Sequence, residues 1–162
     1  MGVMPKIDVT NETIIDSPPL DVYRAILSEF TGVTHWWMPW NENKLRGDIP
    51  ANWEGAIIDI TSNPTSRLKV KFSAKVTKIV EAESIEEEYA GDFLGTGKWT
   101  FEPTDGKTKL KFRFNVRTNR LLFSLISPFV DIGKQTSDCT QKGFKGLATY
   151  LSMRAEMNKT KK

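Results

Sequence analysis

The sequence has few residues that could make covalent or metal cross-links, and it lacks long apolar runs. Among its 162 residues there is one cysteine, Cys139, and one histidine, His35. A single cysteine cannot form an internal disulfide, and a single histidine cannot build a multi-histidine metal site. No apolar run of about 18 residues predicts a membrane span, and the opening MGVMPKIDVTNE has no apolar core of a secretory signal. These absences predict a protein of a reducing compartment, most simply the cytoplasm.

Charge of one sign is not concentrated along the chain, apart from its last residues. The net charge is +3, from 23 Lys and Arg against 20 Asp and Glu, and the two signs are interleaved. A nucleic-acid-binding protein is expected to carry a basic face with aromatic residues set into it, so nucleic acid is not predicted as a partner. The lysines of residues 158–162 predict a disordered basic tail. No repeat or linker divides the sequence, so residues 1–162 are predicted to form one domain.

The hydrophobic pattern predicts a strand, a helix, a series of strands and a long final helix. Residues 7–15 are rich in β-branched side chains, and Ser17 as N-cap with Pro18 at the first helical position predicts a helix start. That helix is expected to end at Gly32, and residues 41–52 read as a polar loop. The remaining elements are predicted strands at 57–60, 68–80 (with a break near Ser73), 84–90, 96–102 and 109–117, then a helix from about 131 to 157.

Residues 30–40, FTGVTHWWMPW, contain three of the five tryptophans and the only histidine. The tryptophan spacing fits neither the three-and-four periodicity of a helix nor the alternation of a strand. A glycine and a proline also break regular structure within the segment. The segment is therefore either an irregular plug that closes the core or the rim of a pocket. His35 within it reads as a loop residue, with a proton-transfer role as the alternative.

Several motifs resemble the SRPBCC superfamily, which includes the START and birch-pollen-allergen-like helix-grip proteins. They are TIIDSPPLDVY at residues 13–23, the Trp36–Trp37 pair, FEPTDG at 101–106 and GLATYL at 146–151. The resemblance implies an α+β helix-grip fold. In that fold a curved antiparallel sheet of six or seven strands wraps a long C-terminal helix, a short helical segment follows the first strand, and an apolar cavity lies between sheet and helix. The lead-in at 121–129 is similar to the polyketide cyclase/dehydrase and lipid transport branch.

If that cavity exists, the aromatic residues are candidates to line it, since ligand pockets are mostly apolar with a few polar anchors. Under this interpretation the tryptophan segment forms a portal, opposite residues 121–129. The candidate ligand-binding residues are Trp36, Trp37, Trp40, Phe72, Tyr89, Trp99, Phe101, Phe112, Phe114, Phe129, Phe144, Leu147 and Leu151. A packed core without a cavity is the alternative.

Glu87 is the candidate polar group, because it shares strand alternation with the apolar residues on either side of it. If those face inward, Glu87 does too, and a buried carboxylate needs a partner. Lys78 follows the phase of its apolar neighbours and is the predicted partner, although a one-residue slip or a bulge near Ser73 would put both groups in water. If the protein is an enzyme, Glu87, Tyr89 and Lys78 are its predicted acid–base groups. No metal site, phosphate loop or dinucleotide fingerprint is present, so no cofactor is predicted.

The glycines are interpreted as local backbone devices. Gly91, Gly95 and Gly97 flank predicted strands and read as turn or bulge residues. Gly143 and Gly146 lie within the last predicted helix, where each costs about 1 kcal/mol relative to alanine. They either permit a strand to approach closely or allow a bend that leaves room for a ligand.

Three functions remain open from the sequence. The favoured hypothesis is binding of a hydrophobic or amphipathic small molecule, such as a lipid or polyketide-like compound, in the internal cavity. The alternative is a polyketide cyclase/dehydratase-like enzyme that acts in the same cavity. The Trp36–Trp37 pair is also similar to the heat-shock-protein ATPase activators, which implies a protein-interaction module with an exposed apolar patch at 36–40.

Overall fold

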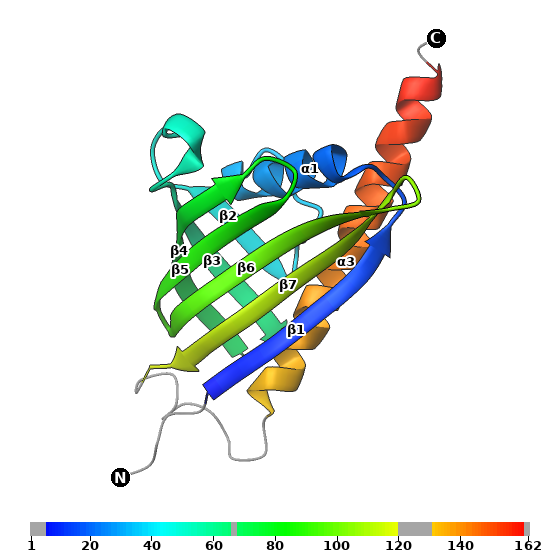
Figure 1. The fold of residues 1–162 in the computed structure, drawn as a ribbon. Coiled ribbons are helices and arrows are strands. Elements are labelled where there is room, and N and C mark those ends of the chain that lie inside the picture. Colours follow the sequence, from blue (N-terminus) through cyan, green and yellow to red (C-terminus); the bar gives the residue numbers. More distant parts are fainter. Residues whose placement is uncertain (1–5, 66–67, 120–130, 161–162) are drawn as a thin grey trace.

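The computed structural model describes residues 6–65, 68–119 and 131–160. Within them, seven strands form one sheet and two α-helices pack beside it (Figure 1). The strands are β1 Lys6–Ile15, β2 Asn41–Leu45, β3 Ile57–Thr65, β4 Leu68–Val80, β5 Ser84–Gly91, β6 Phe93–Thr104 and β7 Lys107–Thr118. The helices are α1 Pro19–Thr31, a 3₁₀ turn η1 Ala51–Trp53, and α3 Ile132–Thr160.

The sheet is antiparallel throughout and has the order β1-β7-β6-β5-β4-β3-β2. It curls around α3, which runs obliquely across its concave side, and α1 lies across one end (Figure 1). Because β1 and β2 occupy opposite edges, the chain between them must cross the sheet, and α1 with the tryptophan segment makes that crossing. The predicted α+β helix-grip fold, with a curved sheet of seven strands around a long C-terminal helix, is confirmed.

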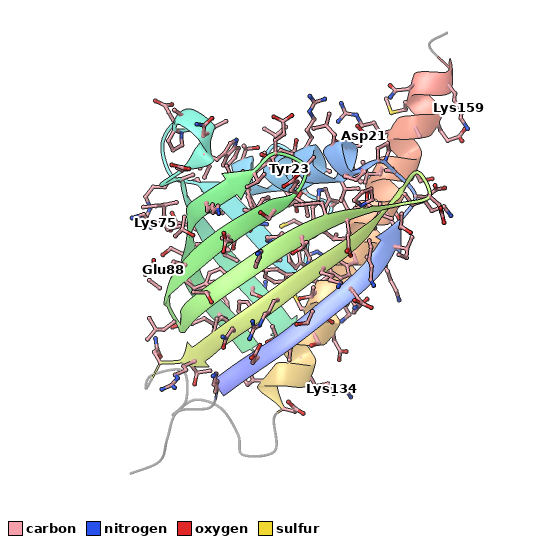
Figure 2. All side chains as sticks on the ribbon, in the orientation of Figure 1. Asp21, Tyr23, Lys75, Glu88, Lys134 and Lys159 are labelled. Atoms are coloured by element: carbon pink, nitrogen blue, oxygen red, sulfur yellow. The ribbon has the colours of Figure 1, made fainter. Side chains whose placement is uncertain are left out.

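Strand alternation divides the sheet into an apolar concave face and a wet convex face. In β7 the apolar residues at 110, 112, 114 and 116 are all buried, whereas Arg113 and Arg117, at alternate positions, are exposed. On the convex side Lys75 of β4 lies opposite Glu88 of β5, and Figure 2 shows both at the outside of the sheet. One buried face and one solvated face are what the predicted alternation required.

Two local predictions are wrong. Residues 41–45 were expected to be a loop, but they form β2 and pair with β3. Their polar sequence has no apolar alternation that would indicate a strand. The strand forms through backbone pairing with β3. The N-cap of α1 is Pro18 rather than Ser17, and no side chain caps this end. Ser17 instead belongs to the preceding turn, where its carbonyl accepts a hydrogen bond from the Thr108 hydroxyl at 2.7 Å.

The final helix is longer than predicted. It continues to Thr160, so residues 158–160 of the predicted tail are helical, and Lys159 pairs with Glu156 at 3.6 Å. The C-terminal part of α3 extends past the end of the sheet (Figure 1), and residues 152–159 are all exposed. Neither α1 nor α3, the α-helices of the described ranges, combines the length and apolar character needed to cross a membrane.

Candidate functional site

A cavity lies between the concave face of the sheet and α3. Its volume is about 50 Å³, counted as space open to the centre of a water molecule. A dry cavity of about 150 Å³ holds benzene, so this cavity holds a few water molecules and no ring-sized guest. Its walls are mainly aromatic: Phe30, Trp37, Asn41, Asn43, Ile60, Ser62, Phe72, Glu87, Tyr89, Phe93, Trp99, Phe112, Phe114, Thr136, Cys139 and Thr140.

The structure places about half of the predicted ligand-binding residues on this cavity. Those that line it are Trp37, Phe72, Tyr89, Trp99, Phe112 and Phe114. Their rings contact one another, as in the stacked pair Trp99 and Phe112, whose centroids are 4.2 Å apart. Phe30 and Phe93 also line it and were not predicted. Alternation along one strand identifies a concave face, but which part of that face meets the cavity depends on the neighbouring strands.

The other predicted residues lie elsewhere. Phe101 is buried at the end near α1, where its ring meets Tyr23 edge-to-face at 5.6 Å. Phe144, Leu147 and Leu151 of α3 are buried in the packed core and do not line the cavity. Trp36 and Trp40 are half-buried outside it. Phe129 and the rest of 121–129 lie outside the described residues.

Glu87 of β5 is the one carboxyl group on the cavity wall among the described residues, and it is 3% exposed. The Trp99 indole Nε1 donates a hydrogen bond to Glu87 Oε1 at 3.0 Å. The Tyr89 hydroxyl also donates to this carboxyl group. Burial raises the pKa of Glu87 to about 7, although the hydrogen bonds from Tyr89 and Trp99 oppose the rise. Glu87 therefore changes its charge near neutral pH, inside an apolar enclosure.

Lys78 does not partner Glu87. A β-bulge between Val76 and Lys78 shifts the pairing of β4, so Val76 lies opposite Glu87 and Lys78 lies opposite Glu86. Lys78 is consequently exposed on the convex face. The extra residue of a bulge reverses the side-chain alternation beyond it. The alternation before Thr77 therefore predicted the wrong face of the sheet for Lys78. The irregularity lies four residues from Ser73, where a break was predicted.

Gly97 of β6 is directly opposite Glu87 of β5 and leaves room for the Tyr89 side chain. A Cβ atom at this position would overlap the hydroxyl oxygen of Tyr89. The absence of a side chain at Gly97 thus lets the Tyr89 hydroxyl lie over β6 and reach the Glu87 carboxyl group, two residues away on the same strand. From the sequence, Gly97 reads only as a turn or bulge residue, because its role depends on the Tyr89 side chain of the neighbouring strand.

The tryptophan segment forms a wall between the sheet and α3. Trp37 is 7% exposed, stacks on Trp36 with centroids 5.7 Å apart, and meets Trp99 edge-to-face at 6.1 Å. Its indole Nε1 donates to the backbone carbonyl of Cys139 at 3.0 Å. Trp40, farther along, lies under the ammonium group of Lys142, 3.6 Å from its ring centroid.

The glycine pair of α3 makes this arrangement possible. A Cβ atom at Gly143 would come within 2.5 Å of the Trp37 indole, and one at Gly146 would overlap the carbonyl oxygen of Trp36. Of the two explanations offered for these glycines, close approach agrees with the structure. The element that approaches is the tryptophan segment, not a strand.

A second polar group lies on the cavity wall near β2 and β3. Asn41 and Asn43 are buried, and the Asn43 side-chain nitrogen has no hydrogen-bond partner in the described part of the chain. Ser62 lies 3.8 Å from the Cys139 sulfur, and burial raises the pKa of the Cys139 thiol. Asn41 and Asn43 were not predicted as site residues, because residues 41–52 were expected to be a loop.

No cluster of three or more His, Cys, Asp or Glu residues that could hold a metal ion occurs in residues 6–65, 68–119 and 131–160. His35 is exposed on the turn between α1 and β2. Its exposure agrees with its interpretation as a loop residue.

Comparison with known proteins bears on the fold. No family model matches the sequence, and no curated protein matches it. Solved structures do match. One is Ara h 8.0201, with a TM-score of 0.66 and 18% identity over 92% of this chain and 99% of that one. Another is CV1439 from Chromobacterium violaceum, with a TM-score of 0.62 and 17% identity over 88% and 95% of the two chains.

The di-domain ARO/CYC protein StfQ of the steffimycin biosynthetic pathway also matches. Its TM-score is 0.65 at 12% identity, and the match covers 93% of this chain and 52% of StfQ. At these identities the likeness concerns the fold. The chain therefore has the helix-grip fold, as its motifs implied.

Proposed function

We propose that this protein binds a hydrophobic or amphipathic small molecule in the cavity between its sheet and α3. The observation that carries the proposal is an aromatic wall interrupted by a buried carboxyl group and by a buried amide nitrogen that has no hydrogen-bond partner among the described residues. Such groups are uncommon in an ordinary core, because a buried amide N–H without a partner costs free energy, and burial disfavours the charged form of a carboxyl group even when it is hydrogen-bonded. Ligand sites combine apolar walls with a few polar anchors in this way.

The fold is consistent with the proposal. Ara h 8.0201 and StfQ have the same architecture, and StfQ is described as an ARO/CYC protein of a biosynthetic pathway. Binding would be driven by burial of apolar ligand surface, at about 25 cal/mol per Å². Since the cavity volume is about 50 Å³, a ring-sized ligand must move a wall. We propose that α3 moves away from the sheet, with Trp37 as the neighbouring wall.

The test uses one variant that fills the cavity and one that does not. Thr140 lines the cavity from α3, so Thr140→Leu should fill it, whereas Thr149→Leu changes the exposed face of the same helix. Binding of 2-naphthylethanol, a neutral probe, is measured by calorimetry. The wild type and Thr149→Leu should bind it alike, and Thr140→Leu should bind at least about tenfold more weakly. Equal binding by all three would place the probe elsewhere and refute the proposal.

Acid–base catalysis is the second candidate function, and one observation favours it. A carboxyl group with a pKa of about 7, beside a tyrosine hydroxyl, is suited to proton transfer at neutral pH. A cyclase or dehydratase of this kind would lose turnover in Glu87→Gln while still binding its substrate. The protein-interaction hypothesis has less support, because Trp37 is buried and the Trp36 indole N–H donates to the Ala25 carbonyl at 3.2 Å.

A further inference from the structure

The Glu87 carboxyl group has hydrogen-bond donors but no cationic partner in the described part of the chain. Trp99 donates at 3.0 Å and Tyr89 donates through its hydroxyl. None of the described residues that line the cavity is Lys, Arg or His. Lys78, the nearest candidate by sequence, faces the other side of the sheet. A buried carboxylate in this position is hydrogen-bonded but not neutralised, which is costly unless the group is protonated or a positive charge pairs with it.

The surrounding walls favour one kind of positive charge. Trp37, Phe72, Trp99, Phe112 and Phe114 surround the same cavity. Aromatic rings attract organic cations through their electron-rich faces. Among the described residues of the wall, Glu87 supplies a single carboxylate, whereas Ca²⁺ takes six to eight oxygen ligands, usually including several carboxylate oxygens. An ammonium group on an apolar body fits both features, since its nitrogen can reach the carboxylate while its carbon atoms contact the rings.

We infer that the cavity selects amphipathic amines, with the protonated nitrogen paired to Glu87 and the apolar body held among the aromatic rings. This inference rests on the proposed binding function and specifies its ligand class. A carboxylate can accept about four hydrogen bonds, so those from Trp99 and Tyr89 leave capacity for an ammonium N–H. Both existing donors favour the ionised carboxylate, which is the form that pairs with a cation.

Among the described residues, Glu87 is the one group on the cavity wall that changes its charge between pH 6 and pH 8. The titratable residues on its wall are Glu87 and Tyr89 of β5 and Cys139 of α3. Burial raises the pKa of the Tyr89 hydroxyl and of the Cys139 thiol, so both stay neutral there. The walls from α1, β2, β3, β4, β6 and β7 contribute no titratable side chain among the described residues. Glu86 of β5 and Lys78 of β4 lie opposite each other in the strand register, and neither lines the cavity.

The experiment compares 2-naphthylethylamine with 2-naphthylethanol, which differ only in the polar end group. At pH 8 the wild type should bind the amine at least about tenfold more tightly than the alcohol. Glu87→Gln should lose that preference, so that its affinities for the amine and the alcohol differ by less than about twofold. The matched control, Glu86→Gln, changes the adjacent carboxyl group outside the cavity and should keep the preference.

A second measurement uses the wild type alone, in case Glu87→Gln does not fold. At pH 6 Glu87 is mostly protonated, so pairing with the amine should release close to one proton per bound ligand. The alcohol should release none. Calorimetry in buffers of different ionisation enthalpy measures this number.

The outcomes separate the inference from the proposed function. Alcohol binding equal to or tighter than amine binding, or amine binding without proton release, overturns the amine inference and leaves the cavity as a binding site. Absence of binding by both compounds overturns both proposals. An amine preference that survives in Glu87→Gln also overturns the inference, because another group would then provide the selectivity.

Discussion

The carboxylate of Glu29 holds the backbone of Trp37 in place, with Oε2 accepting a hydrogen bond from the Trp37 N–H at 3.0 Å. Its other oxygen accepts from the Trp36 N–H at 3.1 Å and from the Thr34 hydroxyl at 2.8 Å. Glu29 is 2% exposed at the end of α1. One buried side chain therefore satisfies three donors of an irregular segment and fixes the wall that Trp37 forms between the sheet and α3.

Glu29→Gln should destabilise the protein by about 3 kcal/mol, because an amide NH₂ group would face backbone N–H groups that need an acceptor. Denaturant unfolding measures the loss. Trp37 should also become more exposed, with a red shift of tryptophan emission. Thr34→Val removes only one of the three donors and should cost about 1 kcal/mol. A Glu29→Gln loss no larger than that of Thr34→Val would show that the carboxylate does not organise the segment.

Gly146→Ala should lower stability by about 2 kcal/mol, even though alanine favours a helix. The new Cβ atom would overlap the carbonyl oxygen of Trp36, which is backbone and cannot swing aside. Gly133→Ala is the matched control on the same helix, since its nearest contact would be Asp131 Oδ1 at 3.4 Å. Thermal unfolding of both variants distinguishes them. A stabilised Gly146→Ala would mean that the tryptophan segment does not press against α3.

Stability should fall as pH rises from about 4.5 to about 7, in part because of Glu87. Its pKa is about 7 in the folded protein against an ordinary value of 4.5. The folded state therefore holds a proton that the unfolded chain has released, so the contribution is complete below pH 4.5 and lost above pH 7. The difference corresponds to about 3 kcal/mol.

Urea unfolding across this pH range, for the wild type and Glu87→Gln, measures that contribution. The variant should lack this part of the decrease. Burial also raises the pKa of Glu29, so some decrease of the same sign should remain in the variant. Parallel curves for the two proteins would mean that Glu87 titrates normally.

Tyr89→Phe should raise the pKa of Glu87 further, because it removes a hydroxyl that donates to the ionised carboxyl group. Carboxyl ¹³C chemical shifts followed through a pH titration measure this change. Tyr150→Phe is the control, since that hydroxyl accepts a hydrogen bond from Arg154 at 2.9 Å on the surface of α3. A Glu87 pKa that stays constant or falls in Tyr89→Phe would exclude the hydrogen bond as a determinant.

The site was partly predictable, and Glu87 with Lys78 shows where prediction failed. Alternation with Ile85 and Tyr89 placed Glu87 inward, and it is buried. The same reasoning placed Lys78 inward, which is wrong because the bulge beyond Val76 reverses the phase of β4. A bulge depends on pairing with the next strand and left no recognisable mark in the residues of β4.

The sequence by itself determined the fold class and the concave face, because periodicity of apolar residues dictates which surfaces leave water. It also identified the tryptophan segment as unusual. Only the tertiary structure decided that Trp99 and Tyr89 meet at Glu87, that Glu29 holds Trp37, and that Gly146 receives the Trp36 backbone. Most of these contacts join residues of different elements, and Tyr89 reaches Glu87 within β5 only because Gly97 of β6 leaves room for its hydroxyl. Their geometry depends on sheet curvature, strand register and helix placement, which arise from packing of the whole chain rather than from local pattern.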